Sequence, residues 1–270
     1  MLDVIGVDSV DVLFSPIPEE LRATDLDLPA GLSELETRER LEALAGRNRT
    51  YGGASFLGAG SYHHSVPAAV RSLTSRAEFA TAYTPYQAEV AQGTLQHIFE
   101  FQTALCELTG LGAANASMYD GPSALAEAAF LALRHNHRER ILASAGLHPE
   151  ERQVVETYAS GPGFEVSTLD LDEASGLTLS PTASELDGVG ALLVRQPNFY
   201  GVIEDVRPLA EAAHEAGALL VVSQYPVSLG LLAPPGQIGA DVAVGDVQPF
   251  GTARSFGGPS AGYLVCREDL

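Results

Sequence analysis

Short apolar runs alternate with segments of helical pattern through the second half of the chain. Apolar runs of this length are typical of strands that are buried on both faces, and alternation with helices is typical of parallel sheets. The chain is therefore expected to form an α/β fold, with a mostly parallel sheet flanked by helices on both faces. The predicted strands are Arg140–Ser144, Phe164–Leu169, Val189–Gln196, Ala218–Val222, Val242–Gly245 and Gly262–Cys266.

Start and stop signals bound the predicted helices. Ser33 and Glu36 form a capping-box pattern for a helix that runs to about Ala45, and Gly46 follows as its stop. A longer helix is predicted from about Glu89 to Thr109, before Gly110. Further helices are predicted over Pro122 to about His135, after His148, and near Glu204–Ala216 before Gly217.

These elements divide the chain in two. We predict a mostly helical N-terminal arm over residues 1–50 and an α/β large domain over residues 51–270. The last predicted strand is followed only by residues 267–270, with no closing helix. We therefore expect the chain to be cut short.

The charge of the chain excludes several partners. Its 15 basic residues stand against 35 acidic residues, which gives a formal net charge of −20. A protein that binds nucleic acid needs a basic surface, and an anionic membrane would repel so acidic a chain. We therefore expect no nucleic-acid or membrane partner. The acidity fits either ordinary solubility or a salt-adapted source.

The cysteines and the N-terminus indicate a cytoplasmic protein. Cys106 and Cys266 share no metal-ligand spacing and are expected to be free thiols in a reducing compartment. The sequence contains no apolar run of about 18 residues, and its first residues lack the basic segment of a signal peptide.

The densest cluster of polar and aromatic residues is Ala80–Glu89. Tyr83, Thr84, Tyr86 and Gln87 precede the long helix, where their hydroxyl and amide groups could orient a ligand. The tyrosines could equally pack at a subunit interface, and both roles can hold together.

A second candidate lies at the start of the helix predicted from Pro122. Backbone N–H groups and Ser123 could hold a phosphate there. Pro122 removes one donor, however, and Asp120 would repel an anion. The alternative is a capped turn with Asp120 as the N-cap residue.

Two loops add weaker candidates. His63 and His64 are adjacent, but no third ligand lies at useful spacing, so we predict no metal site. One of the two histidines could reach an active site. The glycine-rich loop at 251–259 could hold an anion through Arg254, or it could form a tight turn between strands.

Taken together, these segments resemble the first subunit of the decarboxylating glycine dehydrogenase, the P protein of the glycine cleavage system in its two-subunit form. The similarity covers the whole chain. The motifs that carry it lie at residues 55–64, 78–87, 92–96, 115–121, 197–205, 214–217 and 255–259, and include Thr81-Ala-Tyr-Thr-Pro-Tyr-Gln87 and Asn115-Ala-Ser-Met-Tyr-Asp-Gly121.

The resemblance implies the large domain of a fold-type-I transferase that depends on pyridoxal phosphate (PLP), without the family's C-terminal small domain. Two homologous subunits pair in such enzymes, in a heterotetramer, and the cofactor lysine lies in the second subunit. This chain has no lysine, since all 15 of its basic residues are arginines. Arginine cannot form the Schiff base, because its guanidinium stays protonated.

Both cofactor contacts of a catalytic subunit are replaced here. Tyr225 stands where related first subunits often have an aspartate, and Gly245-Asp-Val-Gln-Pro-Phe250 stands where the catalytic subunit carries its lysine. The resemblance thus implies that PLP is held by the partner and that this chain keeps a vestigial pocket. The positions assigned to that pocket are Ser117, Tyr119, Asp120, Gly121, Ser123, Tyr225 and Gln248.

The function implied is support of glycine decarboxylation, with transfer of the aminomethyl group to the lipoyl carrier protein (H protein). The second subunit and this carrier are the expected partners, and no residue of this chain is expected to be catalytic by itself. Residues expected to reach the partner's active site are Tyr83, Thr84, Tyr86, Gln87, His63 and His64. The alternatives are a truncated homologue that binds or regulates the second subunit, and an independent enzyme that works without lysine.

Overall fold

The computed structural model describes residues 1–270 except 24–26, 50–55, 57, 80–83 and 259. Contacts within the chain divide it into two units, Met1–Phe56 and Leu57–Leu270. The division predicted at residue 50 stays a prediction.

The first unit is helical in the residues that the structure describes. It contains α1 (Leu2–Ile5), two 3₁₀ turns and α2 (Glu34–Ala45), and none of these elements has a buried residue. The predicted capping box at the start of α2 is confirmed. Ser33 Oγ accepts from the backbone N–H of Glu36, and the Glu36 carboxylate accepts from the backbone N–H of Ser33 at 2.9 Å.

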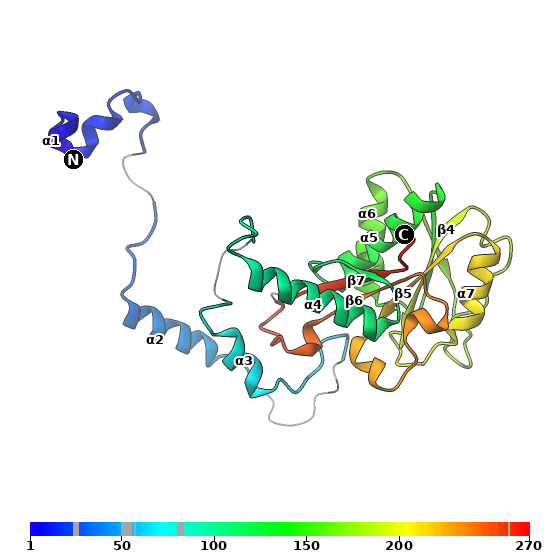
Figure 1. Cartoon of the computed structure of the whole chain (residues 1–270). Helices are drawn as coiled ribbons and strands as arrows, with labels where there is room; N and C mark the ends of the chain where they lie inside the picture. The colour runs from blue at the N-terminus through cyan, green and yellow to red at the C-terminus, as the bar shows by residue number, and fades with distance from the viewer. Residues whose placement is uncertain (24–26, 50–55, 57, 80–83, 259) are drawn as a thin grey trace. The chain divides into compact units, whose positions relative to one another are not determined.

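The second unit is built on one seven-stranded sheet, in the order β1-β7-β6-β5-β4-β2-β3 (Figure 1). The four pairings that join β3, β2, β4, β5 and β6 are parallel, and β7 pairs antiparallel with β6 and with β1. The strands are β1 (Ala113–Ala114), β2 (Arg140–Ser144), β3 (Glu165–Leu169), β4 (Val189–Gln196), β5 (Leu219–Gln224), β6 (Val242–Asp246) and β7 (Gly262–Cys266).

Helices cover both faces of this sheet, as predicted. Alternate residues of each buried strand point to opposite faces, so Leu220 and Val222 pack with α7 while Leu219 and Val221 pack with α5 and α6. The helix α4 packs beside β6 and β7 through Leu105. The helices of this unit are α3 (Ala68–Thr74), α4 (Gln92–Thr109), α5 (Gly121–Asn136), α6 (Pro149–Ser160) and α7 (Val206–Glu215), with 3₁₀ turns at Pro226–Gly230, Pro235–Ile238 and Gln248–Phe250.

Most predicted elements are confirmed, and the errors lie at their ends. Strands β2, β4 and β7 have the predicted bounds, whereas β5 continues to Gln224 and β6 to Asp246. The prediction that α4 begins at Glu89 was wrong, because the N–H groups of Val90 and Ala91 close a turn on Gln87 O before the helix starts. None of the helices in the described part of the chain is long and apolar enough to cross a membrane.

Gly245 in β6 has no side chain, and this leaves room for a hydrogen bond that crosses β6 from β7 to β5. The buried Tyr263 hydroxyl of β7 donates to Gln224 O of β5 at 2.9 Å, and Gly245 lies between them. A Cβ atom on Gly245 would lie 2.4 Å from Gln224 O and 3.0 Å from the Tyr263 hydroxyl oxygen. Only glycine fits at this point, which lies directly before Asp246.

We therefore expect Gly245→Ala to lower the free energy of unfolding by about 1–3 kcal/mol, the usual cost of overpacking. Urea denaturation measures the change. Gly93→Ala is the matched control, because a Cβ there meets nothing within 4 Å and alanine favours the α4 helix. An equal loss in both variants would contradict the packing argument.

Candidate functional site

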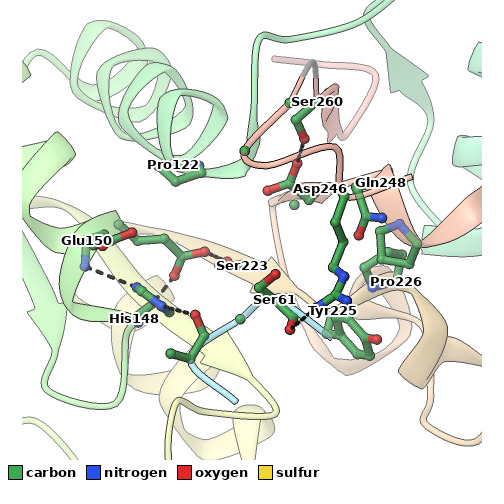
Figure 2. A pocket seen from close by; sticks show the side chains of 18 of the residues that line it. Ser61, Pro122, His148, Glu150, Ser223, Tyr225, Pro226, Asp246, Gln248 and Ser260 are labelled. Carbon is green, nitrogen blue, oxygen red and sulfur yellow. Dashed lines mark hydrogen bonds between the residues drawn. The ribbon is translucent and has the colours of Figure 1, made fainter. Parts of the chain in front are cut away.

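A cleft of about 870 Å³ lies at the carboxyl ends of β4, β5 and β6, the usual place for a ligand in an open parallel sheet. Figure 2 shows His148 and Glu150 at one end of the cleft and Tyr225, Pro226 and Gln248 at the other. The lining residues used below are Ala59, Ser61, Pro122, His148, Glu150, Glu151, Arg195, Ser223, Gln224, Tyr225, Asp246, Gln248, Arg254 and Ser260.

The floor of the cleft is held by a buried ion pair. Arg195, at the end of β4, contacts Glu151 in the first turn of α6, and the Ser223 hydroxyl of β5 donates to the same Glu151 oxygen at 2.8 Å. The Glu151 side chain is 6% exposed and that of Arg195 is 17% exposed. The network ties one helix to two strands and neutralises both charges at the floor.

His148 has a defined tautomer. Its Nδ1 accepts from the backbone N–H of Glu150 at 3.1 Å, so this nitrogen carries no proton. Its Nε2 therefore carries the proton and donates to Ala59 O at 3.0 Å. The neutral imidazole thus caps α6 and holds the segment that leads to Ser61 against the cleft.

The rim of the cleft brings together four residues that the sequence analysis singled out, in two pairs. His64 Nε2 contacts the Tyr225 hydroxyl, and burial raises the pKa of that phenol, which favours its neutral form. His63 Nε2 lies 3.0 Å from Arg254 Nη2. Because arginine only donates, this His63 nitrogen is the acceptor.

The start of α5 is closed to anions. Asp120 is the N-cap residue, and its Oδ1 accepts from Ser123 N at 2.8 Å while its carbonyl accepts from Ala124 N at 3.0 Å. Pro122 has no N–H group. The remaining donor, Gly121 N, lies 3.2 Å from Asp246 Oδ2. Of the two interpretations left open by the sequence, the structure therefore shows the capped turn.

Asp246 projects into the cleft from the end of β6. Ser260 Oγ donates to its Oδ1 at 2.5 Å and Gly121 N to its Oδ2. Burial, the largest influence, raises the pKa of this carboxyl above its usual value, although the two hydrogen bonds oppose the rise.

The remaining predicted site residues lie elsewhere. Thr84, Tyr86 and Gln87 line a second hollow, of about 820 Å³, beside the first turns of α4. The Tyr86 side chain is strongly exposed. Tyr83 lies outside the described residues. Ser117 and Tyr119 are exposed and are not part of the cleft lining, so their assignment to a pocket stays a prediction.

The sequence analysis missed Glu151, Arg195 and Ser223. A signal existed, because Arg195 is the one charged residue of strand β4, whose other residues apart from Gln196 are apolar. Such a residue is buried only with a partner, but the sequence does not say which acid supplies it. Among the residues that the structure describes, no three histidine, cysteine or acidic side chains gather as metal ligands would.

A family model described as the glycine cleavage system P-protein matches residues 1–270. The chain belongs to this P-protein family. The recognition made from the motifs is thus confirmed over the whole chain.

Individual relatives agree with the family. Probable glycine dehydrogenase (decarboxylating) subunit 1 of Desulforamulus reducens is 50% identical over 272 residues, which cover 99% of this chain and 60% of the relative. The protein of the same description in Lysinibacillus sphaericus is 51% identical, over 100% of this chain and 61% of the relative. The chain thus spans about three fifths of the length of the curated relatives it matches.

Solved structures support the fold. A crystal structure of glycine decarboxylase (P-protein) of the glycine cleavage system, in inhibitor-bound form, superposes with a TM-score of 0.91 at 48% identity, over 100% of this chain and 60% of that one. A Burkholderia pseudomallei sphingosine-1-phosphate lyase, 17% identical with a TM-score of 0.64, covers 92% of this chain and 62% of that one, and shows a shared fold alone. The P-protein chain described here has the predicted fold-type-I architecture.

At the level of the family the cofactor is PLP, but the cleft of this chain does not fit it. No lysine is present to form a Schiff base. The donors at the start of α5 are already used, and the carboxylates of Asp120 and Asp246 lie where a phosphate would need positive charge.

The buried ion pair can be tested through stability. Glu151→Ala would leave the buried Arg195 guanidinium without its acidic partner. We therefore expect the free energy of unfolding to fall by about 2–4 kcal/mol. This range allows for the partial exposure of Arg195. Glu156→Ala is the control, since it removes an exposed pair with Arg152 on the same helix, a change of about 0.5 kcal/mol or less. Similar losses measured in urea for both variants would show that the floor network is not stabilising.

The raised pKa of Asp246 predicts a pH dependence. In the unfolded chain the Asp246 carboxyl has a pKa of about 3.9. In the folded protein this pKa is higher, so the folded protein binds the carboxyl proton more tightly. The stability from this group is therefore present below the unfolded pKa and is lost as pH rises through the folded pKa. We expect Asp246→Asn to be stabilising relative to the parent at pH 7, with the difference shrinking toward pH 4.

Asp172→Asn is the control for this titration. A hydrogen bond from the Ser175 hydroxyl lowers the pKa of the Asp172 carboxyl, so the sign is opposite. Its carboxylate stabilises the fold above the unfolded pKa, and the stabilisation is lost as pH falls. The measurement is the free energy of unfolding of both variants and the parent between pH 4 and pH 7. An effect of Asp246→Asn that does not change with pH would contradict the raised pKa of Asp246.

Proposed function

We propose that this chain is the P-protein subunit that lacks the cofactor lysine, and that it supports glycine decarboxylation by a second subunit in the cytoplasm. The observation that carries the proposal is the cleft itself. It keeps the position of a fold-type-I cofactor site, yet it offers neither a lysine nor free donors at the start of α5.

In this proposal PLP would be held by the second subunit, where it would supply the electron sink for decarboxylation. The aminomethyl group then passes to the lipoyl carrier protein. The part of this chain is to pair with the second subunit, as a heterotetramer, and to complete the partner's site with groups that hold or orient the substrate.

The side chains proposed for this role are Tyr83, Thr84, Tyr86 and Gln87, together with His63 and His64. Tyr86 is 88% exposed in this chain, and a phenol so placed before a long helix is free to meet a second protein. The Thr84 carbonyl accepts from Tyr86 N, and the Gln87 carbonyl accepts from Val90 N and Ala91 N in the turn that precedes α4. The backbone that presents Thr84, Tyr86 and Gln87 is thus held by hydrogen bonds of its own.

The direct test is exchange of labelled bicarbonate into glycine, with the second subunit and the lipoyl carrier, in the presence and absence of this chain. We expect exchange only when this chain is present. Binding to the second subunit without exchange would instead support the alternative, a non-catalytic relative that binds or regulates it. Absence of binding would overturn both.

The double variant Tyr83→Ala/Tyr86→Ala tests the positioning role. We expect the exchange rate to fall roughly tenfold or more, since misplaced groups lose that much, while association of the subunits is unchanged. Tyr200→Ala, which removes another exposed tyrosine, is the control and is expected to keep full activity. Full exchange by the double variant would refute the role.

A further inference from the structure

A segment of the chain crosses its own cleft. Residues 58–64, here called the strap, form neither helix nor strand, and Ala59, Gly60 and Ser61 line the cleft. Figure 2 shows Ser61 between His148 and Tyr225, which come from opposite ends of the cleft. Because the strap has no regular structure, contacts with the rest of the second unit must offset the entropy lost in ordering it.

His148 holds the first part of the strap. Its Nε2 donates to Ala59 O at 3.0 Å, and a Cβ atom on Gly60 would lie 3.4 Å from the imidazole ring. The ring itself is fixed, since its Nδ1 accepts from Glu150 N and the Phe199 ring packs edge-on against it, with centroids 4.8 Å apart. The strap thus begins against a side chain that is held in place.

Tyr225 holds the last part of the strap. Its hydroxyl contacts His64 Nε2, and its ring packs edge-to-face with that of Tyr62, with centroids 6.0 Å apart. Tyr225 directly follows β5, so its position is set by the sheet. One side chain of the cleft therefore meets two residues of the strap.

Arg254 makes the third contact. Its guanidinium donates to His63 Nε2 at 3.0 Å and to Ser61 O at 3.5 Å. The three side chains that hold the strap come from places far apart in the sequence, because His148 caps α6, Tyr225 follows β5 and Arg254 lies in the loop between β6 and β7. The cleft thus converges on the strap.

The strap presents other side chains to the outside. His64 is half-buried in its contact with Tyr225, whereas Tyr62 and His63 are exposed. Side chains on a segment without regular structure meet a second protein at a fixed place only when the segment is ordered beforehand. The contacts with the cleft supply that order.

We propose that the cleft works as a clamp for the strap, in which Tyr225, His148 and Arg254 are positioning residues. The clamp presents the exposed His63 to the second subunit, while His64 acts through Tyr225. This inference rests on the proposed function, because the reaction that the clamp serves is that of the second subunit. It also gives a role to a cleft that does not fit PLP.

The first test measures backbone order in the isolated 270-residue chain by ¹⁵N relaxation NMR. We expect order parameters of about 0.8 over residues 58–64 in the parent, and of roughly 0.6 or lower in Tyr225→Phe/Arg254→Gln. Tyr225→Phe alone replaces the double variant if the latter does not fold. Tyr158→Phe, at a tyrosine of α6 that does not line the cleft, is the control. A strap that is flexible in the parent, or equally ordered in the cleft variants, would overturn the clamp.

The second test uses the assembled enzyme and the exchange of labelled bicarbonate into glycine. His64→Ala is expected to slow exchange roughly tenfold or more, because it misplaces the groups that the strap presents. His64→Gln keeps an amide that can meet the Tyr225 hydroxyl, and we expect it to restore most of the rate. This restoration is expected to disappear when Tyr225→Phe is added, with subunit association unchanged throughout.

A histidine that acted on the substrate itself would not be replaced by glutamine. Failure of His64→Gln to restore exchange, or a restoration that does not need the Tyr225 hydroxyl, would therefore refute the positioning role. Loss of order in the cleft variants with unchanged exchange would refute it as well. The relaxation measurement contains no second subunit, so an ordered, clamped strap in a chain that supports no exchange would count against the proposed function alone.

Discussion

The buried pair between Arg195 and Glu151 fixes the geometry on which the cleft depends. It joins the start of α6 to the ends of β4 and β5, with the Ser223 hydroxyl completing the network. A charge pair this deep is retained only where both partners are held in place, because either one alone would be an uncompensated buried charge. Since α6 is anchored in this way, His148 is positioned to cap the helix and to hold the segment before Ser61 across the cleft.

The carboxylates at the start of α5 are the second feature that determines which ligands the cleft can accept. In an open parallel sheet, a helix N-terminus beside the strand ends is a natural anion site. Here Asp120 caps the helix and Asp246 accepts from Gly121 N, so the chain fills that site with its own side chains. The start of α5 therefore offers no free donor to a phosphate, while Arg254 gives the rim of the cleft a separate positive charge.

Much of the fold follows from local patterns. The apolar runs of β2, β4 and β7 and the capping box at Ser33 predict their elements correctly, because burial on both faces and helix capping both leave short-range signals. The antiparallel direction of β7 and the two-residue strand β1 leave no such signal. Strand direction is set by how the connection returns to the sheet, and a two-residue pairing is too short to show a period.

The sequence by itself determined that this chain cannot form a Schiff base, since it has no lysine, and its motifs determined its family. The resemblance also assigns Tyr225 and Gln248 to positions where a catalytic subunit has cofactor contacts, and this assignment stays a prediction. Only the tertiary structure decided that Glu151, 44 residues away, is the partner of Arg195, and that Asp246 meets a helix start 125 residues before it. The physical reason is that hydrogen bonds and ion pairs act over a few ångströms in space, whatever the separation along the chain.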